Sequence, residues 1–210
     1  TLDAELFGYA PAGPDAKARS LVQARRAATI DPYSSVTHLA LARATLFNGN
    51  CTAATRIGRR AIALNPNDPD LHAAIGTLLF NCDDPGAEAI LRRALALDPD
   101  PRASFYAALV FIALDRGDIA TARREVAQIT PPGSIPAFYD VLTAVVAAAD
   151  GDREAARAAW ARVAKADPAI ARDPQALLDR WVLPARLRAK SMDYLRSAGL
   201  VAPAASGAVR

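Results

Sequence analysis

The sequence contains few of the residue types that usually carry chemistry. Its 210 residues include two histidines, two cysteines and one methionine, and aromatic residues make up 6% of the chain. No run reaches the roughly 18 consecutive apolar residues that a membrane span needs, and no signal-peptide pattern opens the chain. We therefore expect a soluble chain without a membrane span and with few candidates for catalysis or metal binding.

The charge is balanced. The chain has 25 basic and 22 acidic residues, a net charge of +3, which by itself does not indicate a nucleic-acid partner. Hydrophobic residues make up 52% of the chain, as in folded proteins. Much of this content is alanine, which favours helix over strand. Because the sequence opens on Thr1 rather than Met, we expect a processed or shortened chain, with a leader or neighbouring domain left open.

Four columns of residues recur at nearly even spacing along the chain. The proline column contains Pro32, Pro66, Pro99, Pro132 and Pro168. The turn column contains Gly49, Asp83, Gly117 and Gly151. A small-residue column contains Ala54, Ala87, Ala122 and Ala156, and a large-residue column contains Leu41, Ile75, Leu109 and the degenerate Thr143. A fixed period of this kind predicts a repeat architecture.

These columns resemble the tetratricopeptide repeat, a helix-turn-helix unit with a period of about 34 residues. The best match is 35–68, with Leu41, Ala42, Gly49, Ala54, Ala61 and Pro66. The resemblance implies an all-α fold, a right-handed α-solenoid of stacked repeats. The predicted organisation is a single domain, 1–210, with a partial repeat at 1–34, repeats at 35–68, 69–101, 102–134 and 135–168, capping helices at 173–200, and a flexible tail at 201–210. The repeats depart from the pattern by a deletion near NCDDPG and an early closure at TPPGSIP.

The apolar pattern predicts the same stacking. First helices such as VTHLALARATLF are apolar on more than one side, whereas second helices such as AATRIGRRAIAL are amphipathic. Stacked repeats need terminal caps. The segment 173–200 breaks the period and predicts two helices separated by Pro184 and ending at Gly199, and we expect it to pack on the last repeat through Leu177, Leu178, Trp181 and Leu187. Its form is weakly similar to the tail that follows such repeats in some bacterial adenylyl cyclases and winged-helix transcriptional regulators.

None of the polar motifs predicts an active site. His38 and His72 lie one repeat period apart, at the same repeat position, and neither has a second ligand three or four positions on, so we interpret both as packing residues. The run NPNDPD lacks the glycine and the closing glutamate of a calcium loop, and predicts the end of one helix and the cap of the next. We expect no catalytic residue, no metal site and no cofactor.

Cys51 and Cys82 fall at adjacent turns on one edge of the expected stack, close enough for a disulfide. Two states stay open: a bridge, which would indicate a periplasmic or other oxidising compartment, and two free thiols in the cytoplasm, which we favour.

Arginine pairs recur on the second helices, as Arg25-Arg26, Arg59-Arg60, Arg92-Arg93 and Arg123-Arg124. They could form a basic stripe on the convex face, but we favour a solvated face laced with acids. Without interleaved aromatics, nucleic acid is an unlikely partner of this domain.

In proteins similar to this one, first-helix residues line a concave groove. The matching positions are Leu39, Arg43, Leu46, Phe47, Asp70, Ala73, Thr77, Phe80, Asn81, Ala107, Phe111 and Asp115. Leu39, Arg43 and Thr77 do not supply the Lys and Asn clamp that grips acidic chaperone tails, so we expect an extended or helical peptide held by apolar contacts. The alternative is that these residues pack against a flanking helix.

The sequence thus predicts a non-catalytic module that binds a protein or peptide partner, as the sensory or scaffolding part of a larger bacterial protein in signalling or transcription regulation. The alternative is the regulatory domain of an enzyme, such as a nucleotide cyclase, whose catalytic segment is absent from this chain. The sequence does not decide the oligomeric state, or whether the concave groove or the convex arginine-rich face is used.

Overall fold

The computed structural model describes residues 15–129 and 136–202, and this part of the chain contains helices and no strand. The helices are α2 (Ala16–Ile30), α3 (Ser35–Phe47), α4 (Cys51–Leu64), α5 (Pro69–Asn81), α6 (Ala87–Leu97), α7 (Ala103–Arg116), α8 (Ile119–Val126), α9 (Pro136–Ala149), α10 (Arg153–Ala166), α11 (Pro168–Arg172), α12 (Pro174–Arg180) and α13 (Ala185–Ser197).

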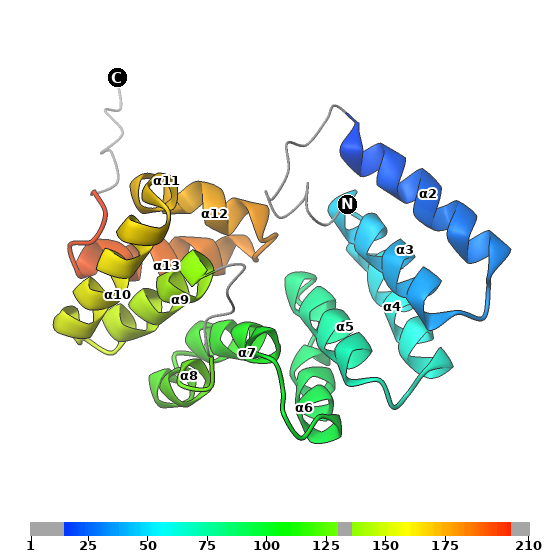
Figure 1. Ribbon diagram of the computed structural model, residues 1–210, viewed down its shortest axis with the longest axis horizontal. Coiled ribbons are helices and arrows are strands. Elements are labelled where there is room, and N and C mark those ends of the chain that lie inside the picture. Colours follow the sequence, from blue (N-terminus) through cyan, green and yellow to red (C-terminus); the bar gives the residue numbers. More distant parts are fainter. Residues whose placement is uncertain (1–14, 130–135, 203–210) are drawn as a thin grey trace.

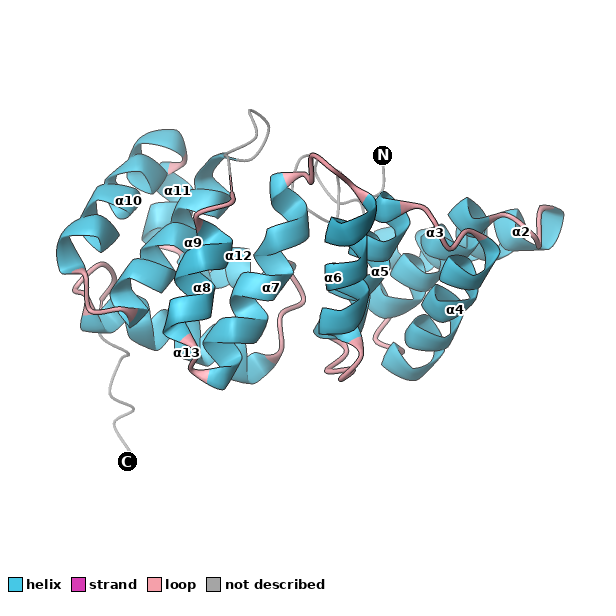
Figure 2. Cartoon of the chain, turned by 90° about the horizontal axis from the view of Figure 1, so that it is seen from below, coloured by secondary structure: helices cyan, strands magenta, loops and turns pink. Residues whose placement is uncertain are grey.

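The helices pack in consecutive pairs, α3 with α4, α5 with α6, α7 with α8 and α9 with α10. The pairs follow one another along an arc, and α11, α12 and α13 close its C-terminal end (Figure 1). Seen from below, α2 lies at one end of the row and α10 near the other (Figure 2). The fold is therefore the α-solenoid of helix-turn-helix repeats that the sequence predicts, with a C-terminal capping pair.

Short polar side chains start these helices. Within the described residues, the side chains of seven N-cap residues accept a hydrogen bond from the backbone N–H three positions on: Ser34, Asn50, Asp68, Asp118, Asp152, Asp167 and Asp173. Asp68 lies within NPNDPD, and Pro69 takes the first helical position, where its missing N–H costs no hydrogen bond. The interpretation of NPNDPD as the join between two helices is confirmed.

The repeat columns correspond to turns and to close helix packing. Gly49, Gly117 and Gly151 have φ of 81°, 73° and 80°, a left-handed conformation that glycine adopts without a steric cost. The small-residue column is buried. A Cβ built on Gly76 of α5 would lie 2.7 Å from Leu91 Cγ, so α5 and α6 approach too closely for a side chain there.

The C-terminal segment forms the two expected helices. Helix α12 ends at Arg180, α13 begins directly after Pro184, and Gly199 has φ of 72°. Leu178 and Leu187 are fully buried. Helix α13 contacts α7 as well as α9, so the cap packs on the third repeat and not only on the last one. The short helix α11 before it was not predicted.

Some expectations fall outside the described residues. These are the part of the partial repeat at 1–14, most of the TPPGSIP segment with the boundary at 134, and the tail from 203 onward.

Candidate functional site: an apolar groove

An apolar cavity of about 260 Å³ opens between the first helices of successive repeats. Helices α3, α5, α7 and α9 and the segment after α12 line it, through Arg43, Leu46, Phe47, Ala74, Thr77, Leu78, Phe80, Asn81, Ser104, Ala107, Ala108, Phe111, Phe138, Tyr139, Trp181, Val182 and Leu183. We call this cavity the groove. Its volume is close to the lower end of the range for ligand pockets, about 300 Å³.

The structure brings most of the predicted site residues to this groove. Those that line it are Arg43, Leu46, Phe47, Thr77, Phe80, Asn81, Ala107 and Phe111. The other four lie elsewhere. Leu39 packs at the edge of the core, and Ala73 joins a small cluster with Phe105. Asp70 forms an ion pair with Arg102, and Asp115 pairs with the capping helix. Partner binding by any of the twelve stays a prediction.

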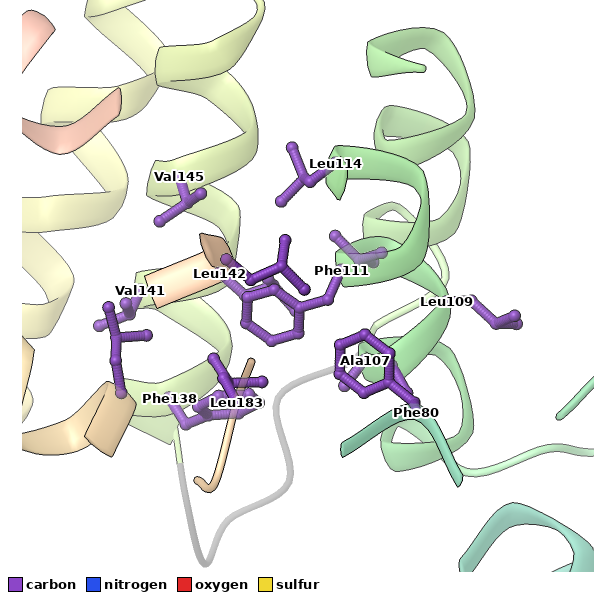
Figure 3. Close-up of a cluster of buried hydrophobic side chains, with 14 of the residues drawn as sticks. Phe80, Ala107, Leu109, Phe111, Leu114, Phe138, Val141, Leu142, Val145 and Leu183 are labelled. Atoms are coloured by element: carbon purple, nitrogen blue, oxygen red, sulfur yellow. The ribbon is translucent and has the colours of Figure 1, made fainter. Parts of the chain in front are cut away.

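Stacked aromatic rings build two sides of the groove. Phe80 of α5 and Phe111 of α7 stack with their centroids 6.2 Å apart. Phe138 of α9 stacks on Trp181, with 3.5 Å between centroids. Figure 3 shows Phe80 and Phe111 side by side, with Phe111 directed from α7 toward Leu142 of α9. Because Phe80 and Phe111 come from neighbouring repeats, the groove depends on how the repeats stack.

Sequence reasoning missed the far side of the groove. Phe138 and Tyr139 lie one repeat period after Ser104 and Phe105, so extending the first-helix columns into the fourth repeat would have pointed to them. Trp181 was expected to pack on the last repeat, and it does so on Phe138 of α9. Val182 and Leu183 offered no such signal, because the capping segment breaks the period. The segment that covers this side of the cavity is the link between α12 and α13 rather than a helix, so the alternative that the groove residues pack against a flanking helix stays open.

Residues 181–184, which we call the strap, cross from α12 to α13 in a strained conformation. Val182 has φ of 53°, a left-handed value that is rare for a β-branched residue. Such strain persists only when surrounding contacts enforce it. The stack of Trp181 on Phe138 and the burial of Leu183 and Pro184 are such contacts.

Charged contacts hold α13 against the repeats. The Arg186 guanidinium donates to both Asp115 carboxylate oxygens, to Oδ1 at 3.0 Å and to Oδ2 at 2.8 Å, and pairs with Asp83 at 2.7 Å. The hydrogen bonds to Asp83 and then Asp115 raise the pKa of Arg186 further above its ordinary value. Lys190 Nζ donates to the Asp115 carbonyl at 3.1 Å. These contacts keep the strap at the groove.

A second set of contacts joins the first two full repeats. Cys51, the first residue of α4, and Cys82, directly after α5, form a disulfide with their Cα atoms 5.4 Å apart. Both cysteines of the chain are therefore bonded in the structure, the state that the sequence left open and did not favour. Beside it, Arg59 of α4 donates to both oxygens of Asp84, at 2.7 and 2.9 Å.

Asp84 is held in its charged form. Burial alone would raise its pKa, but hydrogen bonds from the Gly86 N–H, 2.9 Å away, and from Arg59 outweigh that effect and lower the pKa below 3.8.

The two histidines have structural roles. Nδ1 of His38 lies 2.9 Å from the Ser34 carbonyl, and Nδ1 of His72 lies 2.9 Å from the Asp68 carbonyl. A carbonyl oxygen only accepts, so Nδ1 donates in both rings. Within residues 15–129 and 136–202 no group of three His, Cys, Asp or Glu residues could hold a metal ion. No helix in this part of the chain is long and apolar enough to cross a bilayer.

Several second-helix arginines pair with acids of neighbouring elements. Arg92 lies 2.6 Å from Glu125 of the next second helix, and Arg123 lies 3.2 Å from Asp150. Arg59, Arg92 and Arg123 therefore belong to a solvated outer face on which acids of neighbouring elements pair with the arginines, in agreement with our interpretation of the sequence.

Comparisons with known proteins identify the fold only. No protein-family model matches the sequence, and a search of curated proteins finds no significant match. Among solved structures, the chain is similar to one described as "Functional Characterization of Pseudomonas Aeruginosa pilF", with a TM-score of 0.59 and 16% identity over 81% of this chain and 78% of that chain. That protein is a solenoid of tetratricopeptide repeats. Nothing in these comparisons supports the similarity of the C-terminal segment to cyclases or transcriptional regulators.

Proposed function

We propose that this chain is a non-catalytic interaction module that holds a segment of a partner protein in its groove. The observation that carries the proposal is the convergence of apolar residues from α3, α5, α7 and α9 and the strap on one open cavity. Neighbouring repeats and a cap must assemble before this cavity exists. A repeat fold of this kind supports protein partners over small substrates.

The lining of the groove favours an apolar anchor from the partner. The Thr77 hydroxyl donates to the Ala73 carbonyl of its own helix, so its hydrogen is already used. The remaining polar groups, such as Asn81 and Ser104, are few beside the aromatic surface. Affinity then comes mainly from removing apolar surface from water, at about 25 cal/mol per Å². A bulky apolar side chain of an extended or helical segment fits this chemistry.

The wider context is also part of the proposal. We place the chain as the sensory or scaffolding part of a larger bacterial regulatory protein, with the regulatory domain of an enzyme such as a nucleotide cyclase as the alternative. The full reading frame distinguishes the two, since a cyclase or DNA-binding segment would stand in it. The disulfide supports an oxidising compartment, such as the periplasm, over the cytoplasm.

The groove can be tested with peptides selected from a displayed random library, whose affinities are then measured by calorimetry. Two changes alter the groove without opening the core: Phe47→Ala removes a half-buried wall residue, and Ala107→Leu adds bulk to the lining. Both should weaken peptide binding by about 1 to 2 kcal/mol, as for a hot spot.

The matched control is Tyr33→Ala, which removes a 78% exposed aromatic ring that does not line the groove. It should leave the affinity unchanged. The contrary result is that the peptides bind both groove variants as tightly as the parent chain, while the variants keep the parent's melting temperature. That result would show that the peptides bind outside the groove.

A further inference from the structure

The N-terminal end of the solenoid exposes apolar and basic side chains together. In the described part of the chain, every large hydrophobic side chain that is mostly exposed lies within the segment 22–36: Val22 (61%), Ile30 (74%), Tyr33 (78%) and Val36 (70%). With Arg25 and Arg26 they form a surface that we call the end face. It covers α2, the turn after it and the first turn of α3, at the outer end of the molecule (Figures 1 and 2).

Helical periodicity separates the end face from the core. Ala16, Ser20 and Ala24 recur at every fourth position and are buried on one side of α2, the side that packs on α3. Val22 and Arg26 fall on the opposite side and face solvent. The end face therefore lies on the side of α2 that faces away from the core.

Within residues 15–129 and 136–202, no acid forms an ion pair with the two arginines of the end face. Arg25 and Arg26 form no ion pair within the described residues, unlike Arg59, Arg92 and Arg123 farther along the solenoid. Helix α2 contains no acid, and only Asp15 and Asp31 flank its ends. An anionic surface can therefore reach two arginines here that are unpaired within the described residues, whereas one member of each middle pair, Arg59, Arg92 or Arg123, is already paired with an acid.

We propose that the end face docks the chain on an anionic phospholipid surface, without spanning it. Ile30 and Tyr33 would enter the interface, and Arg25 and Arg26 would lie over the phosphates. Tyrosine is enriched at that depth, and arginine stems can lie along apolar surface while their heads reach charge. Binding then combines buried apolar area with attraction to anionic lipid.

The geometry favours a lipid surface over an acidic protein. A standard protein interface uses roughly 20 to 30 residues on each side, far more than the end face offers. Its basic and apolar side chains also alternate along the segment, and none of them lines the groove, whereas a protein hot spot fills a pocket. A lipid interface needs no shape complementarity. The groove opens elsewhere, between the first helices, so this proposal does not depend on the proposed function.

Co-sedimentation of the full chain with vesicles tests the proposal. The chain should bind vesicles that contain phosphatidylglycerol in phosphatidylcholine and should not bind phosphatidylcholine alone, with affinity falling as salt is added. Each arginine at an anionic surface contributes a factor of about five. The double variant R25Q/R26Q should therefore bind roughly 25-fold more weakly and with a flatter salt dependence.

A second double variant, I30S/Y33S, should also weaken binding while leaving the salt dependence unchanged. The matched control is R93Q/R157Q, which removes the same charge from exposed arginines of α6 and α10 that form no ion pair within the described residues. It should bind like the parent chain. No binding to the anionic vesicles, an equal loss in the control, or binding to dissolved polyglutamate as tight as to vesicles and insensitive to I30S/Y33S would each overturn the proposal.

Discussion

Asp83 occupies a backbone conformation that the other described repeats fill with glycine. Its φ is 55°, a left-handed value that aspartate tolerates better than most residues. The side chain has a second role, because it pairs with Arg186 of the capping helix. The column of turn residues predicted the turn at Asp83. It did not indicate that the side chain would form an ion pair with Arg186, which lies far away in the sequence.

Asp84, the residue after Asp83, makes the stability of the fold depend on pH. Because the effect of burial is outweighed by hydrogen bonds from the Gly86 N–H and Arg59, which lower the folded-state pKa of Asp84, its stabilising contribution is present at pH values above the pKa of an unfolded aspartate. The contribution is lost as the pH falls through the lower folded-state pKa. We expect Asp84→Asn to lower the free energy of unfolding at neutral pH by about 1 kcal/mol. The variant should then lose less stability than the parent chain on acidification.

Urea unfolding across a pH series checks this expectation. The control is Asp100→Asn, which changes an exposed carboxylate that accepts no hydrogen bond within the described residues. It should follow the parent chain at every pH. An Asp84→Asn curve parallel to that of the parent chain would mean that the Arg59 contact contributes no net stability.

At the scale of elements, the strap forms one side of the groove, and α13 follows it along the chain. Leu187 and Leu195 are fully buried, so apolar packing fixes α13 in place. The strap itself is a short segment, held by contacts that include the stack of Trp181 on Phe138 and the burial of Leu183 and Pro184, and Arg186 of α13 forms its ion pairs directly after it. Opening of the strap should therefore cost less than unfolding of α13.

Arg186→Gln tests which contacts hold the strap. We expect faster hydrogen exchange at the amides of residues 181–183 and a loss of about 1 kcal/mol in stability, since the pair is partly exposed. The control is Arg188→Gln, whose partner Asp179 lies 3.3 Å away within the capping segment itself. Only the first variant should change exchange in the strap. Equal exchange in both variants would assign the strap's position to apolar packing alone.

How far the sequence predicts the groove differs between its two sides. The near side comes from repeated first-helix positions such as Phe80, so a period and the resemblance to a known repeat were enough. The far side comes from Trp181 to Leu183, whose position depends on a contact between Arg186 and Asp115, 71 residues apart. No local propensity or period encodes such a pair. The disulfide could be predicted only in part. The repeat pattern placed Cys51 near Cys82, but it did not distinguish a bridge from two free thiols.

For the whole molecule, each repeat is stabilised mainly by its neighbours, so the weakest interface decides where the array unfolds. The contacts that join α4 to α5 and the turn after it include Ile75 against Gly58, the pair of Arg59 with Asp84, and the disulfide. The disulfide closes a loop with a sequence separation of 31 residues. Such a crosslink contributes about 3 to 4 kcal/mol in the loop-entropy description.

Removing the crosslink should therefore uncouple the N-terminal helices from the rest. Both tryptophans, Trp160 and Trp181, lie in the C-terminal half, so fluorescence reports on that half while circular dichroism reports on all helices. We expect the two urea transitions to coincide in the parent chain. In the variant C51S/C82S, the circular dichroism transition should begin at lower urea because α2, α3 and α4 unfold first.

The parent chain with reductant should behave like this variant, and free-thiol alkylation followed by mass measurement should label neither cysteine before reduction. The control is the variant without reductant, which should be unaffected by adding it. Coincident transitions in C51S/C82S would show that Ile75 and the Arg59 pair suffice to couple the repeats, whereas two alkylated thiols before reduction would contradict the bond itself. The two results separate the strength of the interface from the redox state of the chain.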